Sequence, residues 1–244
     1  MTDATRIDRV PVRQRLAWRE ALVVASVAES ASARTLVLGI DGWDEHCAGQ
    51  HLDVRLTAPD GYRATRSYSL SSGPGEVPQI TVERVVDGEV SPFLVDEIEV
   101  GESFEVRGPI GGYFVWEPSD APLVLIGGGS GLAPLRSIWR AAADHPPPVV
   151  IGASARSVDR LIYGDELQSL GATVQLTREA ASGYRAGRID RAVLDDLLAC
   201  AESEVDTTDA VVFVCGPTNF VEHVATLLRA AGVRPDAMRL ERFG

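Results

Sequence analysis

The stretch Arg66-Ser67-Tyr68-Ser69-Leu70-Ser71-Ser72 decides the fold, because two other stretches accompany it at large separations along the chain. These are Gly127-Gly128-Gly129-Ser130-Gly131-Leu132-Ala133-Pro134 and, further on, Cys215-Gly216-Pro217. The stretch Arg66–Ser72 has the residue types of a β-strand, in which successive side chains alternate between two faces. Arg66 and Tyr68 therefore share one face, and Ser69 reaches the same site only if the strand twists or ends there.

The first half of the chain is rich in short strands. Gly, Pro and Asp separate runs that show apolar alternation or β-branched residues. We predict strands at Ala21–Val27, Thr35–Ile40, His51–Leu56, Ser67–Leu70, Ile80–Val86 and Ser103–Val106. Apart from one short helix predicted at Val90–Ile98, this half lacks helical patterns, which indicates an antiparallel six-stranded β-barrel.

The second half changes to strands that alternate with helices. The predicted strands are Leu123–Ile126, Val149–Ile151, Thr173–Thr177, Ala210–Cys215 and Arg239–Glu241. The predicted helices are Ala133–Ala143, Gly164–Leu170, Asp190–Ala199 and Asn219–Ala231. Such alternation calls for a parallel sheet covered on both faces. We therefore predict an α+β chain of two domains, with a mobile lead-in at 1–18, a β-barrel domain at 19–118 and an α/β parallel-sheet domain at 119–244.

The composition of the 244 residues is globular, with 45% hydrophobic and 24% charged residues. No apolar run reaches the roughly 20 residues that span a bilayer, so we expect no membrane span. The net charge is −12, which disfavours a nucleic-acid binder, since phosphate contacts need a basic face. We interpret the negative net charge as one that keeps the protein soluble. The alternative is an acidic docking face for a basic partner, built from Asp96, Glu97, Glu99, Glu102 and Glu105.

The three cysteines, Cys47, Cys200 and Cys215, are widely scattered. They show neither the paired spacing of a zinc site nor the run that holds an iron–sulfur cluster, and we expect no metal site. They imply no disulfide framework, which fits a reducing cytoplasm. The histidines also lack the spacing of a metal site or of a catalytic triad. We expect the protein to be a monomer.

Taken together and in this order, the three motifs resemble the ferredoxin–NADP reductase superfamily. The resemblance covers nearly the whole chain, from about Trp18 to Phe243. It implies that the barrel binds FAD, that the α/β domain binds a nicotinamide nucleotide, and that the two cofactors meet at the domain interface.

The resemblance assigns the flavin contacts residue by residue. Arg66 is expected on the FAD pyrophosphate, where a guanidinium matches phosphate oxygens. Tyr68 is expected against the flavin ring and Ser69 near its reactive nitrogen. Ser91 is also a good N-cap for the short helix, because Pro92 follows it at the first helical position. The remaining residues expected at the FAD are Val82, Gly88, Val90, Ser91 and Phe243.

The glycine-rich stretch follows a predicted strand and precedes a helix, which is the context of a phosphate-binding turn. It is not a G-x-G-x-x-G fingerprint, so a standard Rossmann dehydrogenase is disfavoured. The resemblance places the NAD(P)H pyrophosphate at Gly128, Gly129, Ser130 and Gly131. No carboxylate stands at the end of the next strand to hold a ribose 2′-hydroxyl, which favours NADPH over NADH. The resemblance assigns the 2′-phosphate to Ser154, Arg156 and Arg178; the alternative is that these arginines are surface charges.

Cys215, Gly216 and Pro217 end a predicted parallel strand, at the edge where ligands bind in open α/β sheets. The resemblance puts Cys215 beside the nicotinamide; the alternative is a small buried side chain. It also returns the C-terminal strand, with Glu241, to the flavin. The predicted catalytic residues are therefore Ser69, Cys215 and Glu241.

These expectations amount to a flavin-dependent NAD(P)H oxidoreductase. It passes hydride from NAD(P)H to FAD and then electrons to a separate partner, such as a ferredoxin or an oxygenase. One alternative is a stand-alone reductase of free flavin or small oxidants. Another, of a different class, is a non-catalytic flavin-binding regulatory or assembly subunit.

Overall fold

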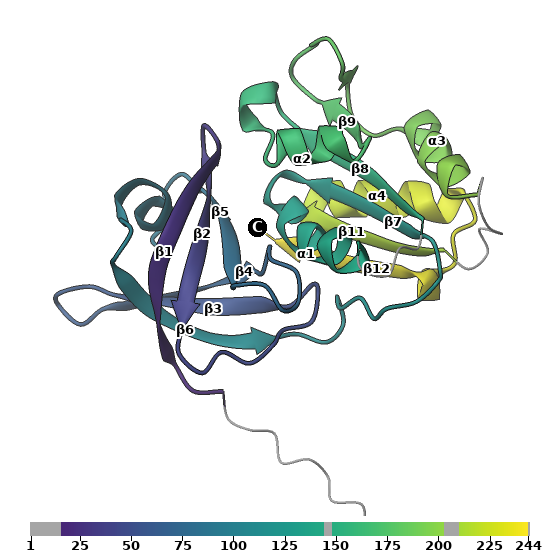
Figure 1. Cartoon of the computed structure of the whole chain (residues 1–244). Helices are drawn as coiled ribbons and strands as arrows, with labels where there is room; N and C mark the ends of the chain where they lie inside the picture. Colours follow the sequence, from purple (N-terminus) through teal and green to yellow (C-terminus); the bar gives the residue numbers. More distant parts are fainter. Residues whose placement is uncertain (1–15, 144–147, 203–209, 244) are drawn as a thin grey trace, which may run out of the picture.

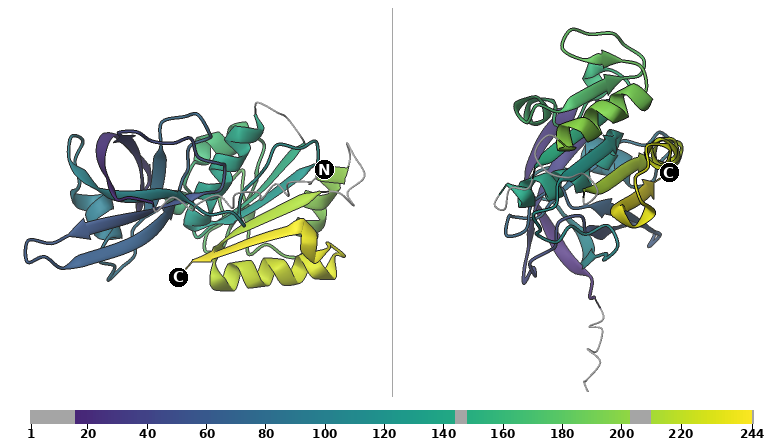
Figure 2. Two further views of the ribbon diagram at one scale, coloured as in Figure 1. Left: turned by 90° about the horizontal axis from the view of Figure 1, so that it is seen from below. Right: turned by 90° about the vertical axis from the view of Figure 1, so that its right-hand side faces the viewer.

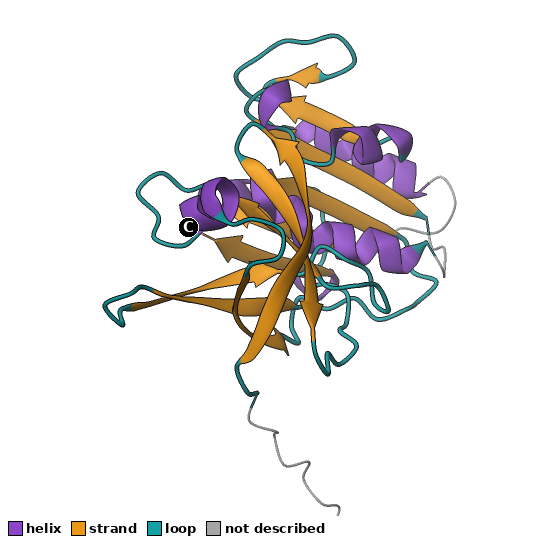
Figure 3. Cartoon of the chain, turned by 60° about the vertical axis from the view of Figure 1, so that its left-hand side comes forward, coloured by secondary structure: helices purple, strands orange, loops and turns teal. Residues whose placement is uncertain are grey.

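The computed structural model describes residues 16–143, 148–202 and 210–243. Within them, an all-β unit from the first half lies beside an α/β unit from the second half (Figure 1). The helices are concentrated in the second unit (Figure 3). The predicted fold class is therefore confirmed. Most of the predicted lead-in lies outside the described residues.

The first unit is a six-stranded antiparallel sheet with the strand order β4-β3-β6-β1-β2-β5. A bridge between Leu70 and Ile80 joins the chain after β4 to β5, and so closes the sheet into a barrel. Fully buried leucines, among them Leu36, Leu38 and Leu52, fill its interior. The strands are Arg19–Ser30 (β1), Ala33–Ile40 (β2), His51–Thr57 (β3), Arg63–Ser69 (β4), Gln79–Glu83 (β5) and Ser103–Ile110 (β6).

The second unit is a parallel sheet with the strand order β10-β9-β8-β7-β11-β12. Its strands are Leu123–Gly128 (β7), Val149–Ala155 (β8), Thr173–Leu176 (β9), Arg185–Ala186 (β10), Val211–Pro217 (β11) and Met238–Phe243 (β12). Its helices are Leu132–Ala142 (α1), Gly164–Ser169 (α2), Arg191–Glu202 (α3) and Thr218–Ala230 (α4).

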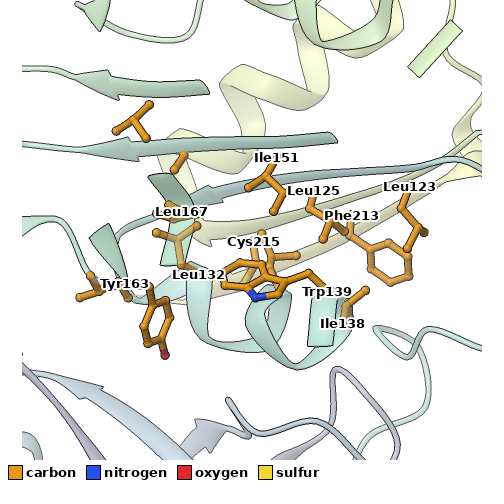
Figure 4. Close-up of a cluster of buried hydrophobic side chains, with 14 of the residues drawn as sticks. Leu123, Leu125, Leu132, Ile138, Trp139, Ile151, Tyr163, Leu167, Phe213 and Cys215 are labelled. Atoms are coloured by element: carbon orange, nitrogen blue, oxygen red, sulfur yellow. The ribbon is translucent and has the colours of Figure 1, made fainter. Parts of the chain in front are cut away.

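The central strand β7 is buried on both faces, as expected for a parallel strand covered by helices. Leu123 and Leu125 belong to the cluster that contains α1 side chains (Figure 4). Val124 and Ile126 belong to the cluster that contains α3 and α4 side chains. The strand ends at the glycine turn, which is thereby held at the carboxyl edge of the sheet.

Three local details differ from the prediction. The short strand β10 was not predicted, because its two residues are exposed and carry no alternation. The helix predicted at Val90–Ile98 is a shorter turn, Phe93–Glu97. The prediction that Ser91 caps this helix is wrong: the helix has no side-chain cap, and the Ser91 hydroxyl accepts a hydrogen bond from the Val85 N–H (3.0 Å).

A polar network joins the two units. From α1, the Arg136 guanidinium donates to the Gln79 side chain of the barrel (3.0 Å), and Arg140 pairs with Glu76 (2.7 Å). The hydroxyl of the buried Tyr163 donates a hydrogen bond to Thr81 on β5. Because these contacts cross the interface, they hold β5 and the loop before it against the α/β unit.

Residues 111–122 connect β6 to β7, and the domain boundary expected at 118 falls in this segment. Phe114 and Trp116 are buried and join the core of the α/β unit. Phe114 packs edge-on against Phe213 of β11, with ring centroids 5.1 Å apart. The connection is therefore packed onto the second unit and is not a free linker.

Candidate functional site

A cleft of about 720 Å³ lies between the two units. Its barrel wall comes from β3, β4, β5 and the loop that follows β5. Its other wall comes from the glycine turn, α1 and the end of β12, which points toward the barrel (Figure 2). The cleft gathers these residues predicted from the sequence: Arg66, Tyr68, Ser69, Gly88, Val90, Ser91, Ser130, Glu241 and Phe243.

Strand β4 delivers three of them because it ends inside the cleft. It stops at Ser69, so the strict alternation that would separate Ser69 from Arg66 and Tyr68 no longer applies. All three side chains line the same cleft. The condition set by the sequence, a strand end at Ser69, is met.

Arg66 is held at the cleft by a carboxylate. Its guanidinium pairs with Glu89 (2.8 Å), which also accepts from the Tyr62 hydroxyl (2.7 Å). The Arg66 side chain remains 53% exposed. It is therefore available to an incoming anion that displaces Glu89.

Tyr68 is half-buried between the cleft and the barrel core. Burial raises the pKa of its phenol to about 12, against a smaller opposing effect of Arg66. The ring therefore stays neutral at physiological pH and presents an aromatic face to the cleft.

The loop after β5 forms a tight cradle at Gly88. A Cβ atom added there would lie 3.0 Å from the Ser91 hydroxyl oxygen and 3.1 Å from the Val85 carbonyl oxygen. A side chain at Gly88 would therefore crowd the cradle, which lies in the lining of the cleft. Small residues here leave the main chain open to a bound group.

Glu241 meets Ser69 across the unit boundary. Burial raises the pKa of the Glu241 carboxyl to about 7, and a hydrogen bond with the Ser69 side chain acts in the opposite direction. Glu241 can therefore hold or release a proton near neutral pH. A carboxyl with a raised pKa that lines a cleft is a candidate for a functional role.

Cys215 lies next to Glu241, because the two residues pair in the parallel β11–β12 register. Its thiol is 1% exposed and belongs to the core cluster beneath α1 (Figure 4). Burial is the main cause that raises the pKa of the Cys215 thiol, and the Glu241 charge raises it further. Cys215 is therefore a neutral thiol, not a thiolate nucleophile, and it does not line the cleft itself.

The glycine turn packs directly against the end of β11. A Cβ atom added at Gly131 would overlap the main-chain oxygen of Cys215, so only glycine fits. Gly129 has a φ of 56°, in the left-handed region that glycine adopts most readily. These two requirements explain the glycines at positions 129 and 131, and Ser130 between them lines the cleft.

The predicted 2′-phosphate residues lie at the ends of β8 and β9, outside the lining of this cleft. Ser154 is buried and pairs with Gly128 of the glycine turn in the β7–β8 register. The Arg178 N–H donates to the Arg156 carbonyl oxygen (2.9 Å), so the two exposed arginines are neighbours. Neither forms an ion pair with any residue that the structure describes.

Several predicted residues take other places. The Val82 side chain is fully buried in the barrel core, while its neighbours Thr81 and Glu83 line the cleft. Pro217, Gly216, Gly128, Gly129 and Gly131 also lie outside the cleft lining.

Sequence reasoning missed several ionisable residues of the cleft: His51, Glu83, Asp87, Glu89 and Arg242. His51 faces Ser69 in the β3–β4 register. Burial lowers the pKa of its imidazole, against an opposing effect of the Asp53 carboxylate. His51 could not be predicted, because one sequence does not reveal which residues of two strands pair. Glu83 could have been predicted, because the period of two along β5 places it on the same face as Thr81.

The described part of the chain contains no group of three or more His, Cys, Asp or Glu side chains that could hold a metal ion. None of its helices combines the length and apolar character needed to cross a membrane.

Two sequence families match this chain, one for each unit. The oxidoreductase FAD-binding domain matches residues 20–115. The oxidoreductase NAD-binding domain matches residues 125–226. The two matches divide the chain as the structure does, into the barrel and the α/β unit.

Curated relatives are longer proteins. The chain is 30% identical over 243 residues to the ferredoxin reductase component of a Mycobacterium tuberculosis 3-ketosteroid-9-alpha-monooxygenase. That match covers 92% of this chain and 65% of the relative. It is 29% identical over 216 residues to a Bacillus subtilis flavohemoprotein, with 82% of this chain and 52% of the relative covered. The chain thus spans about half to two thirds of the length of these relatives.

Solved structures agree in fold. The FAD/NAD-binding domain of Vibrio cholerae nitric oxide dioxygenase superposes with a TM-score of 0.83 at 26% identity, covering 94% of this chain and all of that one. An Amycolatopsis cytochrome P450 reductase superposes with a TM-score of 0.79 at 26% identity, covering 93% of this chain and 70% of that one. With an FAD-binding barrel joined to an NAD-binding α/β unit, the chain belongs to the ferredoxin reductase-type FAD- and NAD-binding oxidoreductases.

Proposed function

We propose that this protein is a flavin reductase that takes hydride from NAD(P)H onto FAD and passes electrons to a separate acceptor protein. The observation that carries the proposal is the meeting of Ser69 and Glu241 in a cleft between the FAD-binding and NAD-binding units. A hydride donor and a flavin bound to the two units would face each other there.

The cleft has the donor set that FAD needs. The Arg66 guanidinium suits a pyrophosphate, the Gly88 cradle leaves main chain free for it, and Tyr68 offers an aromatic face. Phe243 lines the opposite wall and is 36% exposed. Bound FAD supplies the exchange between two-electron and one-electron chemistry.

The chain's own residues supply orientation and proton control. Ser69 and Glu241 line the same cleft, and burial raises the pKa of the Glu241 carboxyl to about 7, so this carboxyl can take up or release a proton near neutral pH. The polar network around Arg136 and Tyr163 keeps the two walls in register. Cys215 contributes a neutral, buried surface behind the reacting position.

We propose NADPH as the preferred donor. Arg156 and Arg178 lie side by side at neighbouring strand ends and are unpaired with any described carboxylate, so both are available to a 2′-phosphate. The buried Ser154 stands between them and the glycine turn. No carboxylate precedes Asp159 in this loop to select the ribose 2′-hydroxyl of NADH.

For the acceptor, the oxygenase reductase relatives support a separate redox protein, and we further propose a cytoplasmic monomer. Cys47 and Cys215 are free thiols, as a reducing compartment allows. Two alternatives remain: a reductase of free flavin or small oxidants, and a non-catalytic flavin-binding subunit. Comparing turnover with different electron acceptors distinguishes both from this proposal.

The comparison is of acceptors under one set of conditions. FAD-loaded protein is supplied with NADPH, and turnover is followed with ferredoxins and oxygenase components, with free FMN and with ferricyanide. A protein acceptor that turns over far faster than free flavin supports the proposal. Turnover with small oxidants alone supports the stand-alone reductase, and absence of any reduction supports the non-catalytic subunit.

A further inference from the structure

A barrel carboxylate binds the glycine turn of the other unit. Glu83, the last residue of β5, accepts a hydrogen bond from the Ser130 N–H (2.9 Å). The same carboxylate closes over Gly129, where an added Cβ atom would lie 3.0 Å from its oxygen. Glu83 is therefore seated on the main chain of the turn.

The main-chain N–H groups of the glycine turn favour an anion. Gly129 has a positive φ, and the turn leads directly into α1, so its N–H groups have no helical acceptor. Among the described residues, Glu83 forms no ion pair that would draw its carboxylate elsewhere. Nearby cations of the cleft are engaged, Arg66 with Glu89 (2.8 Å) and Arg242 with Glu222 (2.7 Å).

We propose that Glu83 is an intramolecular latch that occupies the pyrophosphate position of the nicotinamide nucleotide and must leave before the nucleotide binds. The inference rests on the proposed function, which assigns that pyrophosphate to the turn. A carboxylate and a pyrophosphate are both anions, so the turn accepts one or the other.

The latch lowers the apparent affinity for the nucleotide. The apparent dissociation constant equals the intrinsic one divided by the fraction of molecules whose turn is open. A latch that is closed in about nine of ten molecules weakens binding about tenfold. The nucleotide's entry also frees the Glu83 carboxylate into the cleft, on the face of β5 that carries Thr81.

The test removes the carboxylate without touching the expected nucleotide contacts. Glu83→Gln keeps the size of the side chain, and Glu83→Ala removes it. Glu99→Gln is the matched control, because Glu99 is exposed, lies outside the cleft and undergoes the same change of charge. The probe is ADP-ribose, which carries the pyrophosphate but no nicotinamide. Its binding to the FAD-loaded variants is measured by calorimetry, so that no turnover is needed.

We expect Glu83→Ala to bind ADP-ribose about tenfold more tightly than the unchanged protein, and Glu83→Gln about threefold, since a neutral acceptor holds the turn less strongly. Glu99→Gln should bind it unchanged. Unaltered or weaker binding by both Glu83 variants, each with FAD retained, overturns the latch and makes Glu83 an organiser of the turn. An equal gain in Glu99→Gln also overturns it, as an effect of overall charge.

The two proposals fail in different ways. If the unchanged protein binds neither ADP-ribose nor NADPH, and the Glu83 variants do not either, the nucleotide assignment of the turn is wrong. If the unchanged protein binds ADP-ribose and the Glu83 variants show no gain, only the latch is wrong.

Discussion

Glu241 gives the sharpest physical prediction, because its pKa is raised from 4.5 to about 7 in the folded protein. Between these values the folded protein holds a proton that the unfolded chain has released. Stability is therefore full below the unfolded pKa and falls as the pH rises through the folded one. Glu241→Gln cannot ionise, so it removes this loss and should be more stable than the unchanged protein above neutral pH.

The magnitude follows from the shift. Each pKa unit corresponds to about 1.4 kcal/mol. The Glu241 side chain is partly exposed, and solvent screening reduces the full value. We expect Glu241→Gln to unfold with a free energy about 2 to 3 kcal/mol higher than the unchanged protein at about pH 8, and nearly equal at about pH 4.5.

The assay is urea unfolding followed by far-ultraviolet circular dichroism, at constant excess FAD, across this pH range. Glu99→Gln is the control, since it makes the same charge change at an exposed position. Its difference from the unchanged protein should be small at every pH. A Glu241→Gln difference that does not grow with pH would refute the buried, proton-holding carboxyl.

The other predictions concern cofactor binding and hydride transfer. Arg66→Ala should weaken FAD about tenfold but FMN little, because FMN lacks the pyrophosphate, and charged hydrogen bonds contribute about 1.5–3 kcal/mol; equal retention of FAD on dialysis would remove Arg66 from the site. Cys215→Ala should slow single-turnover flavin reduction about tenfold or more while leaving the nucleotide dissociation constant nearly unchanged, because small displacements of reacting groups are costly; an unchanged rate would make Cys215 a packing residue. Arg156→Ala with Arg178→Ala should raise the KM for NADPH about tenfold or more and spare that for NADH; an unchanged ratio of kcat/KM values would make both arginines surface charges.

The fold was predictable because its elements carry strong periodic signals. Leu36 and Leu38 alternate with residues on the outer face of β2, and the uninterrupted apolar run of β7 is buried on both sides. Strand β10 carried no such signal, because Arg185 and Ala186 are exposed and join the sheet only through their main chains.

The lining of the cleft was predictable where a motif supplies it, as at Arg66 and Tyr68, and not where tertiary packing does. His51 lines the cleft because β3 pairs with β4 in a particular register, which one sequence does not contain. Glu83 reaches Ser130 only because the two units dock. Ser91 has the residue type of a helix cap, but its hydroxyl oxygen instead accepts a hydrogen bond from the Val85 N–H.

The central claim is that hydride passes from a nicotinamide nucleotide to a flavin in the cleft between the two units. The direct measurement is anaerobic mixing of the FAD-loaded protein with NADPH, with the visible absorption of the flavin followed in a stopped-flow instrument. The account predicts that the yellow band bleaches in a single turnover, faster with NADPH than with NADH. A flavin that stays oxidised, in protein shown by calorimetry to bind both FAD and NADPH, would contradict it.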